Sequence, residues 1–401
     1  MNLTATAQAT LLLTCYFSSS KTNEHKPLSN TEWGRFALWL KHQRIAPADL
    51  LIPNPELLLI GWNDPRIPLT RIVNLLGRGN SLALAVDKWQ RAGLWIMTRA
   101  DADYPARLKN ILRIDSPPVL FGCGNKALLH TGGIAIVGSR NVAEDDLVFT
   151  RQLASHLAHQ GITVISGGAR GTDEGAMLAA LENGGNSIGV LTDSLLKATT
   201  STKWRNGLMS DKLVLISPFY PEAGFSVANA MARNKYVYCL SESAMVVHAG
   251  LKGGTITGAL EALKNRWVPV WVKPNQDDES ANKLLVEKGA MWSAGQAEEI
   301  DGQQLLTAAK AVTNINLAPQ HDLFALRDNV AEYAIKPTRV PVDYYQLFVN
   351  ELPYLAAEPI RAEDLINVTG LTLEQLRAWL LRAKEDRVVT QLPESDYYLA
   401  R

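Results

Sequence analysis

The chain has 401 residues, of which 47% are hydrophobic, and its 40 Lys and Arg balance its 40 Asp and Glu to a formal net charge of zero. This length and hydrophobic content predict a soluble globular protein that buries more than one core, with roughly two to four domains. Zero net charge excludes an overall basic field, so any polyanionic partner must be held by a local cluster of basic groups.

We find no signal for export or for a membrane in the sequence. A short apolar run at 11–16 lacks a basic flank and falls short of the roughly 18 apolar residues that span a bilayer. The three cysteines, Cys15, Cys123 and Cys239, are odd in number, far apart and without metal-ligand spacing. We therefore expect a cytoplasmic protein without a metal or other cofactor.

Residues 1–115 are predicted to form a helical N-terminal domain. Apolar residues recur there at helical spacing, as in Trp33, Phe36 and Leu40. The turn that holds Gly77 and Gly79 separates two helical patterns and is similar to a SAM or helix-hairpin-helix domain, although an ordinary loop between helices is the simpler interpretation of the turn alone.

Residues 116–295 are predicted to form a Rossmann-like domain. Apolar, β-branched runs alternate with helical segments, which is typical of a parallel sheet covered by helices on both faces. The predicted fold class is therefore α/β, with a mostly parallel sheet flanked by helices. The predicted strands are IAIVG, ITVIS, SIGVL, LVLIS, YVYCLS, MVVHAG and VPVWVK.

Residues 296–341 are predicted to form a helical extension and a linker, since the proline-interrupted stretch KPTRVPVD precedes the last segment. Residues 342–401 hold three helical patterns and two short β-like runs, the order of a winged helix. This last segment has 10 acidic and 6 basic residues, a balance of −4. Contact with a protein, or oligomer packing, is therefore expected of it in preference to DNA binding.

The first candidate site is the turn after the strand IAIVG. Gly138 ends the strand, Ser139 can cap the next helix or donate to a phosphate oxygen, and Arg140 offers a planar guanidinium suited to phosphate. The backbone N–H groups and the dipole of a following helix would favour an anion at such a turn.

A second glycine turn, SGGARGTDEGA at 166–176, follows one helix and one strand later. Gly167, Gly168 and Gly171 let the backbone approach a ligand, and Arg170 adds charge. Asp173 is expected in the first turn of the next helix, where it stabilises the helix dipole, orients a nearby arginine or contacts a ribose hydroxyl. We expect an orienting role for Asp173 and no catalytic residue, because no histidine or second acid stands at a useful position beside it.

Two further clusters are expected at the same edge of the sheet, because loops after parallel strands meet at their carboxyl ends. The first precedes the predicted strand YVYCLS and the second precedes a helix. These clusters are Arg233, Asn234 and Lys235, and then Lys252, Gly253, Gly254, Thr255 and Thr257.

Aromatic residues and one histidine accompany these clusters. Phe219, Tyr220 and Phe225 lie in a proline-rich loop, where they either stack on bases or pack as a lid over the sheet. His248 is a lone histidine at a strand end, and we expect it to have a core or loop role.

Taken in order, these motifs resemble the DNA-processing protein A family, also called DprA or Smf, over residues 99–291. The chain is identified as a divergent member of that family. The motifs that carry the resemblance are VGSR, SGGARGTDEGA, GGNSIGVL, ISPFYPEAGFSVANAMARNKYVYCLS, VVHAGLKGGTITGALEA and NKLLVEKGA.

The resemblance implies a protein that binds single-stranded DNA without sequence preference, often as a homodimer. It also implies a role in loading RecA recombinase during recombination or natural transformation, and the partner could equally be another recombination or phage-defence protein. The phosphate-binding positions that it implies are Ser139, Arg140, Gly167, Gly168, Arg170, Arg233, Asn234, Lys235, Gly254, Thr255 and Thr257.

This chain departs from the family pattern at the expected ligand edge. Met177 replaces a histidine, Met231 and Ala232 replace a Phe-Pro pair, Lys235 replaces an arginine, and His248 replaces an acid. Two other functions therefore stay open. One is a small-nucleotide sensor or nucleotide-cleaving enzyme, for which KGGTITGALE is a partial match to PGGxGTxxE, and the other is an adaptor that recruits a protein through its last segment.

Overall fold

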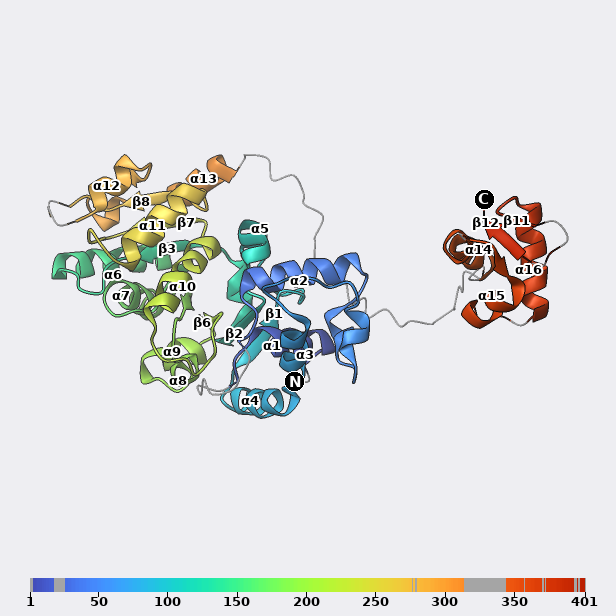
Figure 1. Ribbon diagram of the computed structural model, residues 1–401. Coiled ribbons are helices and arrows are strands. Elements are labelled where there is room, and N and C mark those ends of the chain that lie inside the picture. The colour runs from blue at the N-terminus through green and yellow to red at the C-terminus, as the bar shows by residue number, and fades with distance from the viewer. Residues whose placement is uncertain are drawn as a thin grey trace. The chain divides into compact units, whose positions relative to one another are not determined.

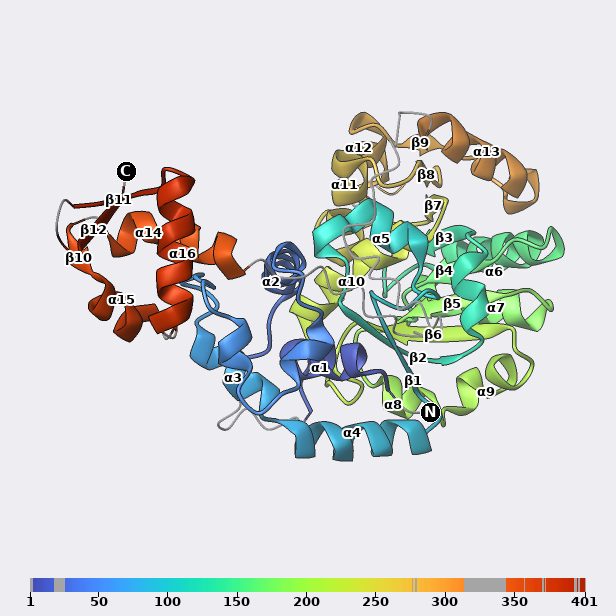
Figure 2. The same ribbon diagram turned by 90° about the vertical axis from the view of Figure 1, so that its right-hand side faces the viewer.

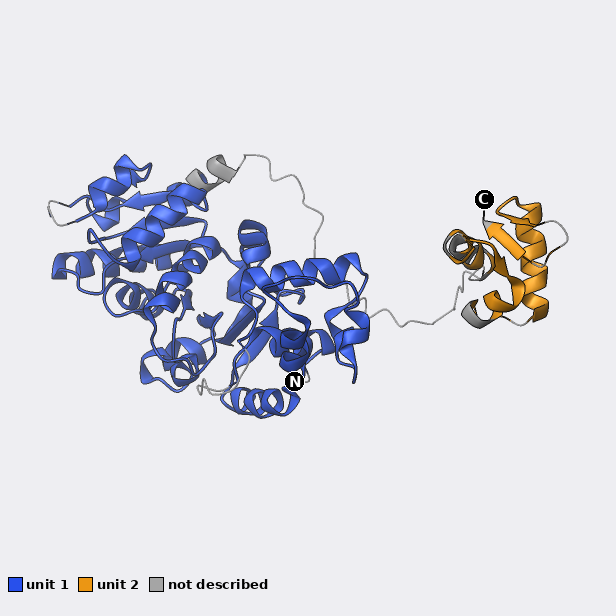
Figure 3. Ribbon diagram, in the orientation of Figure 1, with its two compact units in different colours: residues 1–327 blue, residues 328–401 orange. Residues whose placement is uncertain are grey.

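The computed structural model describes residues 3–17, 26–275, 277, 280–313, 344–356, 358–369, 371, 373–392, 395 and 397–400. The chain divides into two compact units, residues 1–327 and 328–401 (Figure 3). The part of the expected linker at 314–341 lies outside the described residues.

The first unit is built on one nine-stranded sheet with the order β1-β2-β6-β5-β4-β3-β7-β8-β9, which can be followed from the bottom to the top of the sheet in Figure 2. All neighbouring strands are parallel except β1 with β2 and β2 with β6. The mostly parallel α/β sheet is therefore confirmed. The strands are β1 Trp95–Thr98, β2 Val119–Gly124, β3 Ile134–Val137, β4 Val164–Ser166, β5 Ser187–Val190, β6 Leu213–Ser217, β7 Ser243–Val246, β8 Val270–Val272 and β9 Met291–Trp292.

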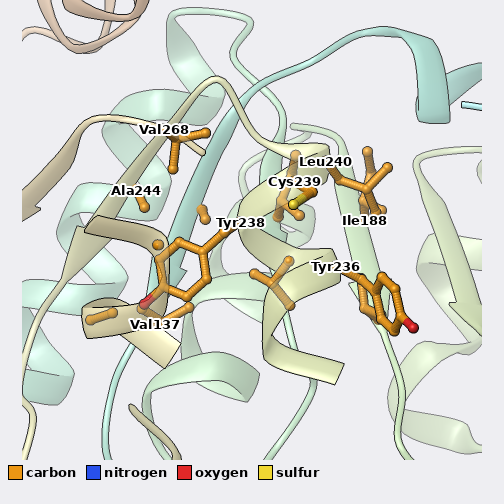
Figure 4. Close-up of a cluster of buried hydrophobic side chains, with 14 of the residues drawn as sticks. Val137, Ile188, Tyr236, Tyr238, Cys239, Leu240, Ala244 and Val268 are labelled. Carbon is orange, nitrogen blue, oxygen red and sulfur yellow. The ribbon is translucent and has the colours of Figure 1, made fainter. Parts of the chain in front are cut away.

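Helices cover both faces of the sheet, as the sequence predicts. Strand β3 illustrates this arrangement, because its alternate side chains are buried on opposite faces. Ile134 and Ile136 pack with helices on one face, while Ala135 and Val137 belong to the cluster on the other face, drawn in part in Figure 4. The first face carries α6 Glu144–His159, α7 Thr172–Glu182 and α13 Gly302–Thr313. The second face carries α5 Ala106–Leu112, α10 Val227–Leu240, α11 Gly254–Asn265 and α12 Asn282–Glu287.

The N-terminal helices gather around β1 and β2 (Figure 1). Trp33, Phe36 and Leu40 form part of their core, as their helical spacing predicts. Leu11 and Trp89 instead share a cluster with the strands β2 and β6, and β1 is a strand within the segment that was expected to be helical. The N-terminal helices are α1 Ala5–Thr14, α2 Asn30–His42, α3 Leu69–Leu76 and α4 Gly79–Arg91. Two further helices, α8 Leu195–Ala198 and α9 Thr202–Met209, lie near β6.

Short 3-10 helices complete the described part of this unit. They are Pro47–Leu50, Pro55–Leu58, Arg113–Asp115, Lys126–His130 and Ala297–Glu299. None of the helices in the ranges given above is both long and apolar enough to cross a membrane.

One predicted strand is wrong. The run YVYCLS at 236–241 forms no strand, because residues up to Leu240 belong to the C-terminal half of α10. Residues 236–240 are all buried, so no polar face marks the helical period, and the β-branched and aromatic composition favours a strand prediction. Arg233, Asn234 and Lys235 therefore lie inside a helix and not before a strand.

The second unit has its own core, which includes Phe348, Leu365, Leu376 and Leu380. Its three helices overlap the three segments predicted to be helical, although the first two end one to three residues later than predicted. A strand that the sequence did not indicate, β10, joins the two C-terminal strands in an antiparallel sheet of order β10-β12-β11. The elements are α14 Tyr344–Leu355, β10 Ile360–Arg361, α15 Ala362–Thr369, α16 Leu373–Glu385, β11 Val389–Gln391 and β12 Tyr397–Ala400.

Candidate functional site

A pocket of about 290 Å³ opens at the carboxyl ends of β3 and β7. The order of the strands reverses between these two neighbours, since the chain continues from β3 to β4, β5 and β6 on one side and resumes with β7, β8 and β9 on the other. Ligands of open α/β sheets bind at such a switch point. The expected site residues that line this switch-point pocket are Ser139, Arg140, Asp173, Arg233, Asn234, Lys252, Gly253, Gly254 and Thr255.

The floor of the pocket is a buried ion pair. Nη1 of Arg233 lies 3.4 Å from Oδ2 of Asp173, and the two side chains are 5% and 9% exposed. The Asp173 carboxylate also accepts hydrogen bonds from the backbone N–H groups of Gly138 and Ala169, so it ties the two glycine turns together. Burial raises the pKa of this carboxyl above its ordinary value, and Arg233 opposes the shift. Asp173 thus positions Arg233, and neither Arg140 nor Arg170 pairs with it.

Gly167 is needed by the protein itself. A β-carbon at this position would lie 1.0 Å from Nη1 of Arg233 and 2.4 Å from Oδ2 of Asp173, so any side chain would displace the ion pair. The close approach that the sequence assigns to a phosphate is therefore made, at Gly167, by an arginine of the same chain.

The two helix N-termini at the site differ in charge. Helix α7 carries Asp173 and Glu174 in its first turn, and these carboxylates offset the positive end of its dipole. Helix α11 begins after Gly253 with no acidic residue in its first turn and no side-chain cap. Thr255 Oγ1 donates to the Gly138 carbonyl at 3.0 Å, which holds the start of α11 against the first glycine turn. The N-terminus of α11 is therefore the end that can receive an anion.

Exposed basic groups stand at the rim of the pocket. Arg140 and Lys252 are exposed, and neither forms an ion pair with another residue of the described ranges. The Arg140 guanidinium lies 4.6 Å from the ring centroid of Phe225, whose side chain is 53% exposed. This stack combines a positive charge with an aromatic surface that a base can cover.

A second pocket of about 540 Å³ adjoins the first and shares Arg140, Ala169 and Phe225 with it. Its other predicted site residues are Gly167, Gly168 and Arg170, and the guanidinium of Arg170 donates to Asn141 at 2.9 Å. The Arg140–Phe225 stack thus lies at the boundary of two connected pockets.

Three expected site residues line neither pocket. Gly171 caps α7, and a β-carbon there would lie 2.6 Å from the Arg140 carbonyl oxygen. Lys235 places its Nζ 5.1 Å from the ring centroid of Tyr236, and Thr257 Oγ1 donates to the Gly253 carbonyl at 2.8 Å. Because α10 is a helix, Lys235 points elsewhere than Asn234, whose Nδ2 donates to the Gly254 carbonyl at 2.8 Å.

His248 is a site neighbour that sequence reasoning missed. Its Nδ1 lies 3.2 Å from Ser139 Oγ, and its Nε2 lies 3.0 Å from Asp277 Oδ2. The signal that could have found it is the replacement of a family acid by this histidine. Of the loop aromatics, Tyr220 packs edge-on against Trp89, whereas Phe225 is the exposed one at the pocket. Over the described residues, no group of three or more His, Cys, Asp or Glu could hold a metal ion.

Comparison with known proteins agrees with this fold. Protein Smf of Synechocystis is 25% identical over 410 residues, covering 92% of this chain and 99% of the relative. DNA processing protein DprA of Bacillus subtilis is 27% identical over 267 residues, covering 60% of this chain and 88% of the relative. The structure of DprA from Streptococcus pneumoniae superposes with a TM-score of 0.56 at 20% identity, covering 75% of this chain and 97% of that one, which supports the fold.

The model of the family described as DNA recombination-mediator protein A matches residues 95–302, more than half of the chain. This range contains the sheet, both glycine turns and the switch-point pocket. The chain belongs to the DNA recombination-mediator protein A family, whose members are named DprA or Smf.

Proposed function

We propose that this protein binds single-stranded DNA through the phosphate backbone at the carboxyl edge of its sheet. The observation that carries the proposal is the gathering of Arg140, Lys252 and the acid-free N-terminus of α11 around one pocket at the switch point. Exposed Phe225 beside Arg140 adds a stacking surface, and basic groups interleaved with an aromatic are typical of sites for single strands. Membership of a DNA recombination-mediator family supports the same ligand.

The proposal extends to the biological setting. We infer that the protein acts in the cytoplasm as a homodimer and delivers the bound strand to RecA or to another recombination or phage-defence protein. We interpret the second unit as a winged helix and the N-terminal helices as a SAM or helix-hairpin-helix domain. In this role the protein binds and hands over DNA without catalysis.

Salt-dependent binding tests the proposal. Anisotropy of a labelled oligo-dT strand should give a logarithm of affinity that falls linearly with the logarithm of salt concentration, by about 0.7 per neutralised phosphate. Arg140→Ala should lower both the affinity and this slope, because it removes an exposed charge at the rim. Arg151→Ala removes an exposed arginine on α6 that lines neither pocket, and it should change neither quantity. Absent binding, or binding that ignores salt, would contradict the proposal.

One observation favours the alternative of a nucleotide-cleaving enzyme. Hydrogen bonds connect the hydroxyl of Ser139, the imidazole of His248 and the carboxylate of Asp277. This arrangement can activate a nucleophile. Glu261, the acid of the partial KGGTITGALE match, does not line the pocket. Incubation with nucleoside monophosphates should release base only if this alternative holds; Ser139→Ala would then abolish the release, while Glu261→Ala, outside the pocket, would leave it unchanged.

A further inference from the structure

His248 is joined to Ser139 by two hydrogen bonds at the carboxyl edge of the sheet. The backbone N–H of Ser139 donates to the His248 carbonyl oxygen at 2.9 Å, and Oγ of Ser139 lies 3.2 Å from Nδ1 of the imidazole. On the other side of the ring, Nε2 lies 3.0 Å from Oδ2 of Asp277. The His248 side chain is 15% exposed, and these two partners account for both of its ring nitrogens.

The backbone on both sides of this imidazole is held by Asn282, whose side chain is fully buried. Oδ1 of Asn282 accepts from the N–H of Ala249 at 3.0 Å, and Nδ2 donates to the carbonyl oxygens of Val247 and Lys273, at 2.9 Å each. These hydrogen bonds connect the chain that leaves β7 with the chain that leaves β8. The imidazole is therefore fixed between its two partners by the ends of neighbouring strands.

The hydrogen bonds assign the proton of the neutral imidazole to Nε2. The carboxylate of Asp277 can only accept, so Nε2 donates to it. Nδ1 then carries no proton and accepts from the hydroxyl of Ser139. A phosphate oxygen also can only accept, so it needs the hydroxyl proton that Ser139 already donates to the ring. The neutral form of His248 thus prevents Ser139 from donating to a phosphate.

The protonated form of His248 has the opposite effect. Both nitrogens of an imidazolium donate, so Nδ1–H donates to Oγ of Ser139 and the hydroxyl proton can turn into the switch-point pocket, which Ser139 lines. The new positive charge also offsets the carboxylate of Asp277, which would otherwise repel an anion. Both changes favour an anion beside Ser139.

The other charged groups around the imidazole are paired or exposed. Lys273, directly after β8, pairs with buried Asp146 of α6 at 2.5 Å, and the ion pair at the floor of the pocket is neutral. Residues 278–279 lie outside the described residues. The carboxylate of Asp277 is the described charge that hydrogen-bonds to the ring. The exposed charged residues of the adjoining loops and of the first turns of α6 and α12 are Arg140, Glu144, Asp145, Lys252 and Lys283.

We propose that His248 is a positioning residue that makes the binding of an anion at Ser139 depend on a proton. The inference rests on the proposed binding of single-stranded DNA and adds regulation by pH to it. An imidazole ordinarily changes its charge between about pH 5 and pH 8, so DNA binding strengthens as the pH falls through this range. Because the coupling is reciprocal, binding of the strand also takes up a fraction of one proton.

The experiment measures anisotropy of a labelled oligo-dT strand without terminal phosphates at constant ionic strength, at about pH 8 and at about pH 5.5. The unmodified protein should bind about fivefold more tightly at the lower pH, the effect expected of one hydrogen bond gained by the ligand. Calorimetry midway between these pH values, in two buffers that differ in ionisation enthalpy, should show net proton uptake on binding.

His248→Gln should keep the affinity at the higher pH but lose both the gain at the lower pH and the proton uptake. The Gln amide accepts from Ser139 and donates to Asp277, as the neutral imidazole does, but it takes up no proton. Asp277→Asn keeps an acceptor for Nε2 and removes the charge, so the gain should move to lower pH. His159→Gln is the matched control, since His159 is exposed on α6 and lines neither pocket, and it should keep the gain. Thermal unfolding at both pH values checks that each variant is folded.

Three results would overturn the inference. Salt-dependent binding by the unmodified protein that is equal at the two pH values, or weaker at the lower one, would remove the proton and leave the proposed DNA binding standing. A gain at the lower pH that survives in His248→Gln would assign the proton to another group. Release of base from nucleoside monophosphates that increases with pH would assign the neutral imidazole to catalysis, since a general base must be unprotonated. A strand that binds at neither pH would instead refute the proposed function itself.

Discussion

Arg233 and Asp173 lie at the centre of the site, yet their first role is to shape it. Both are buried, and the carboxylate holds backbone N–H groups of both glycine turns while it fixes the guanidinium. A buried ion pair contributes little net stability, but the loss of one partner is strongly unfavourable because the other charge is left uncompensated. We therefore expect these two residues to act on binding through the position of the turns.

The first prediction concerns the glycine that packs on this pair. Gly167→Ala should lower the free energy of unfolding by about 2 kcal/mol, because the new methyl group overlaps Arg233 and the buried pair must shift. Urea denaturation of the full chain measures the change. Gly224→Ala is the control, since a β-carbon at Gly224 meets no atom within 4 Å. Equal stability of Gly167→Ala and the unmodified protein would contradict the packing role of Gly167.

At the level of single residues, the sequence predicted which groups gather but not which of them are buried. Nine of the residues expected to bind phosphate or to orient the site line the switch-point pocket, because the ends of parallel strands bring their loops together. Arg233 is 4% exposed, and nothing in the local sequence distinguishes it from exposed Arg140. His248 was treated as a lone residue because its partners Ser139 and Asp277 are distant in the sequence.

At the level of elements, the spacing of apolar residues along the sequence explains which predictions were correct. The strands β3 to β6 were found because each is a short, fully buried apolar run bounded by turns. Helix α10 was partly misread for the same reason, since its last five residues are buried on all sides and resemble such a run. The edge strand β1 was missed because it pairs antiparallel with β2, outside the alternation of parallel strands and helices.

Helix α2 offers a prediction at this scale. Ser29 and Glu32 form a capping box, and the Glu32 carboxylate also receives both terminal nitrogens of Arg71, at 3.0 and 3.1 Å. Partial burial alone would raise the pKa of Glu32, but hydrogen bonds from Arg71 and Ser29 outweigh it and lower the pKa to about 2. The folded pKa lies below the unfolded one, so the stabilisation is present above about pH 4.3 and is lost as pH falls toward 2.

Glu32→Gln should therefore destabilise the protein at pH 7 by about 1 kcal/mol, since Gln keeps the capping hydrogen bond but loses the charge that Arg71 binds. The midpoint of urea unfolding, followed by tryptophan fluorescence, should differ from that of the unmodified protein at pH 7 and converge with it near pH 2. Arg151→Gln breaks a pair of exposed side chains away from the first turn of α6 and should have no measurable effect at either pH. A difference that persists at acid pH would show that Glu32 acts without its charge.

At the level of the whole molecule, the two ends of the chain differ in net charge, and the two units have separate hydrophobic cores. Residues 1–130 carry 15 basic and 9 acidic residues, a balance of +6, whereas residues 342–401 carry 6 and 10, a balance of −4. The second unit has a core of its own, and among the residues that the structure describes the clusters of the first unit extend no further than Leu306. We therefore propose that the two units act separately, and that the first binds DNA while the second binds a protein partner.

A chain that ends at residue 341 tests this division. Because every core cluster of the first unit is retained and an acidic segment is lost, the shortened protein should bind oligo-dT with the same salt slope and within about twofold of the original affinity. If the acidic second unit recruits the recombinase, the full chain should capture RecA in a pull-down and the shortened chain should not. Anisotropy and the pull-down are read on the same preparations, and thermal unfolding confirms that the shortened chain is folded. Loss of DNA binding together with capture would refute the division of labour, and intact capture would assign the partner surface to the first unit.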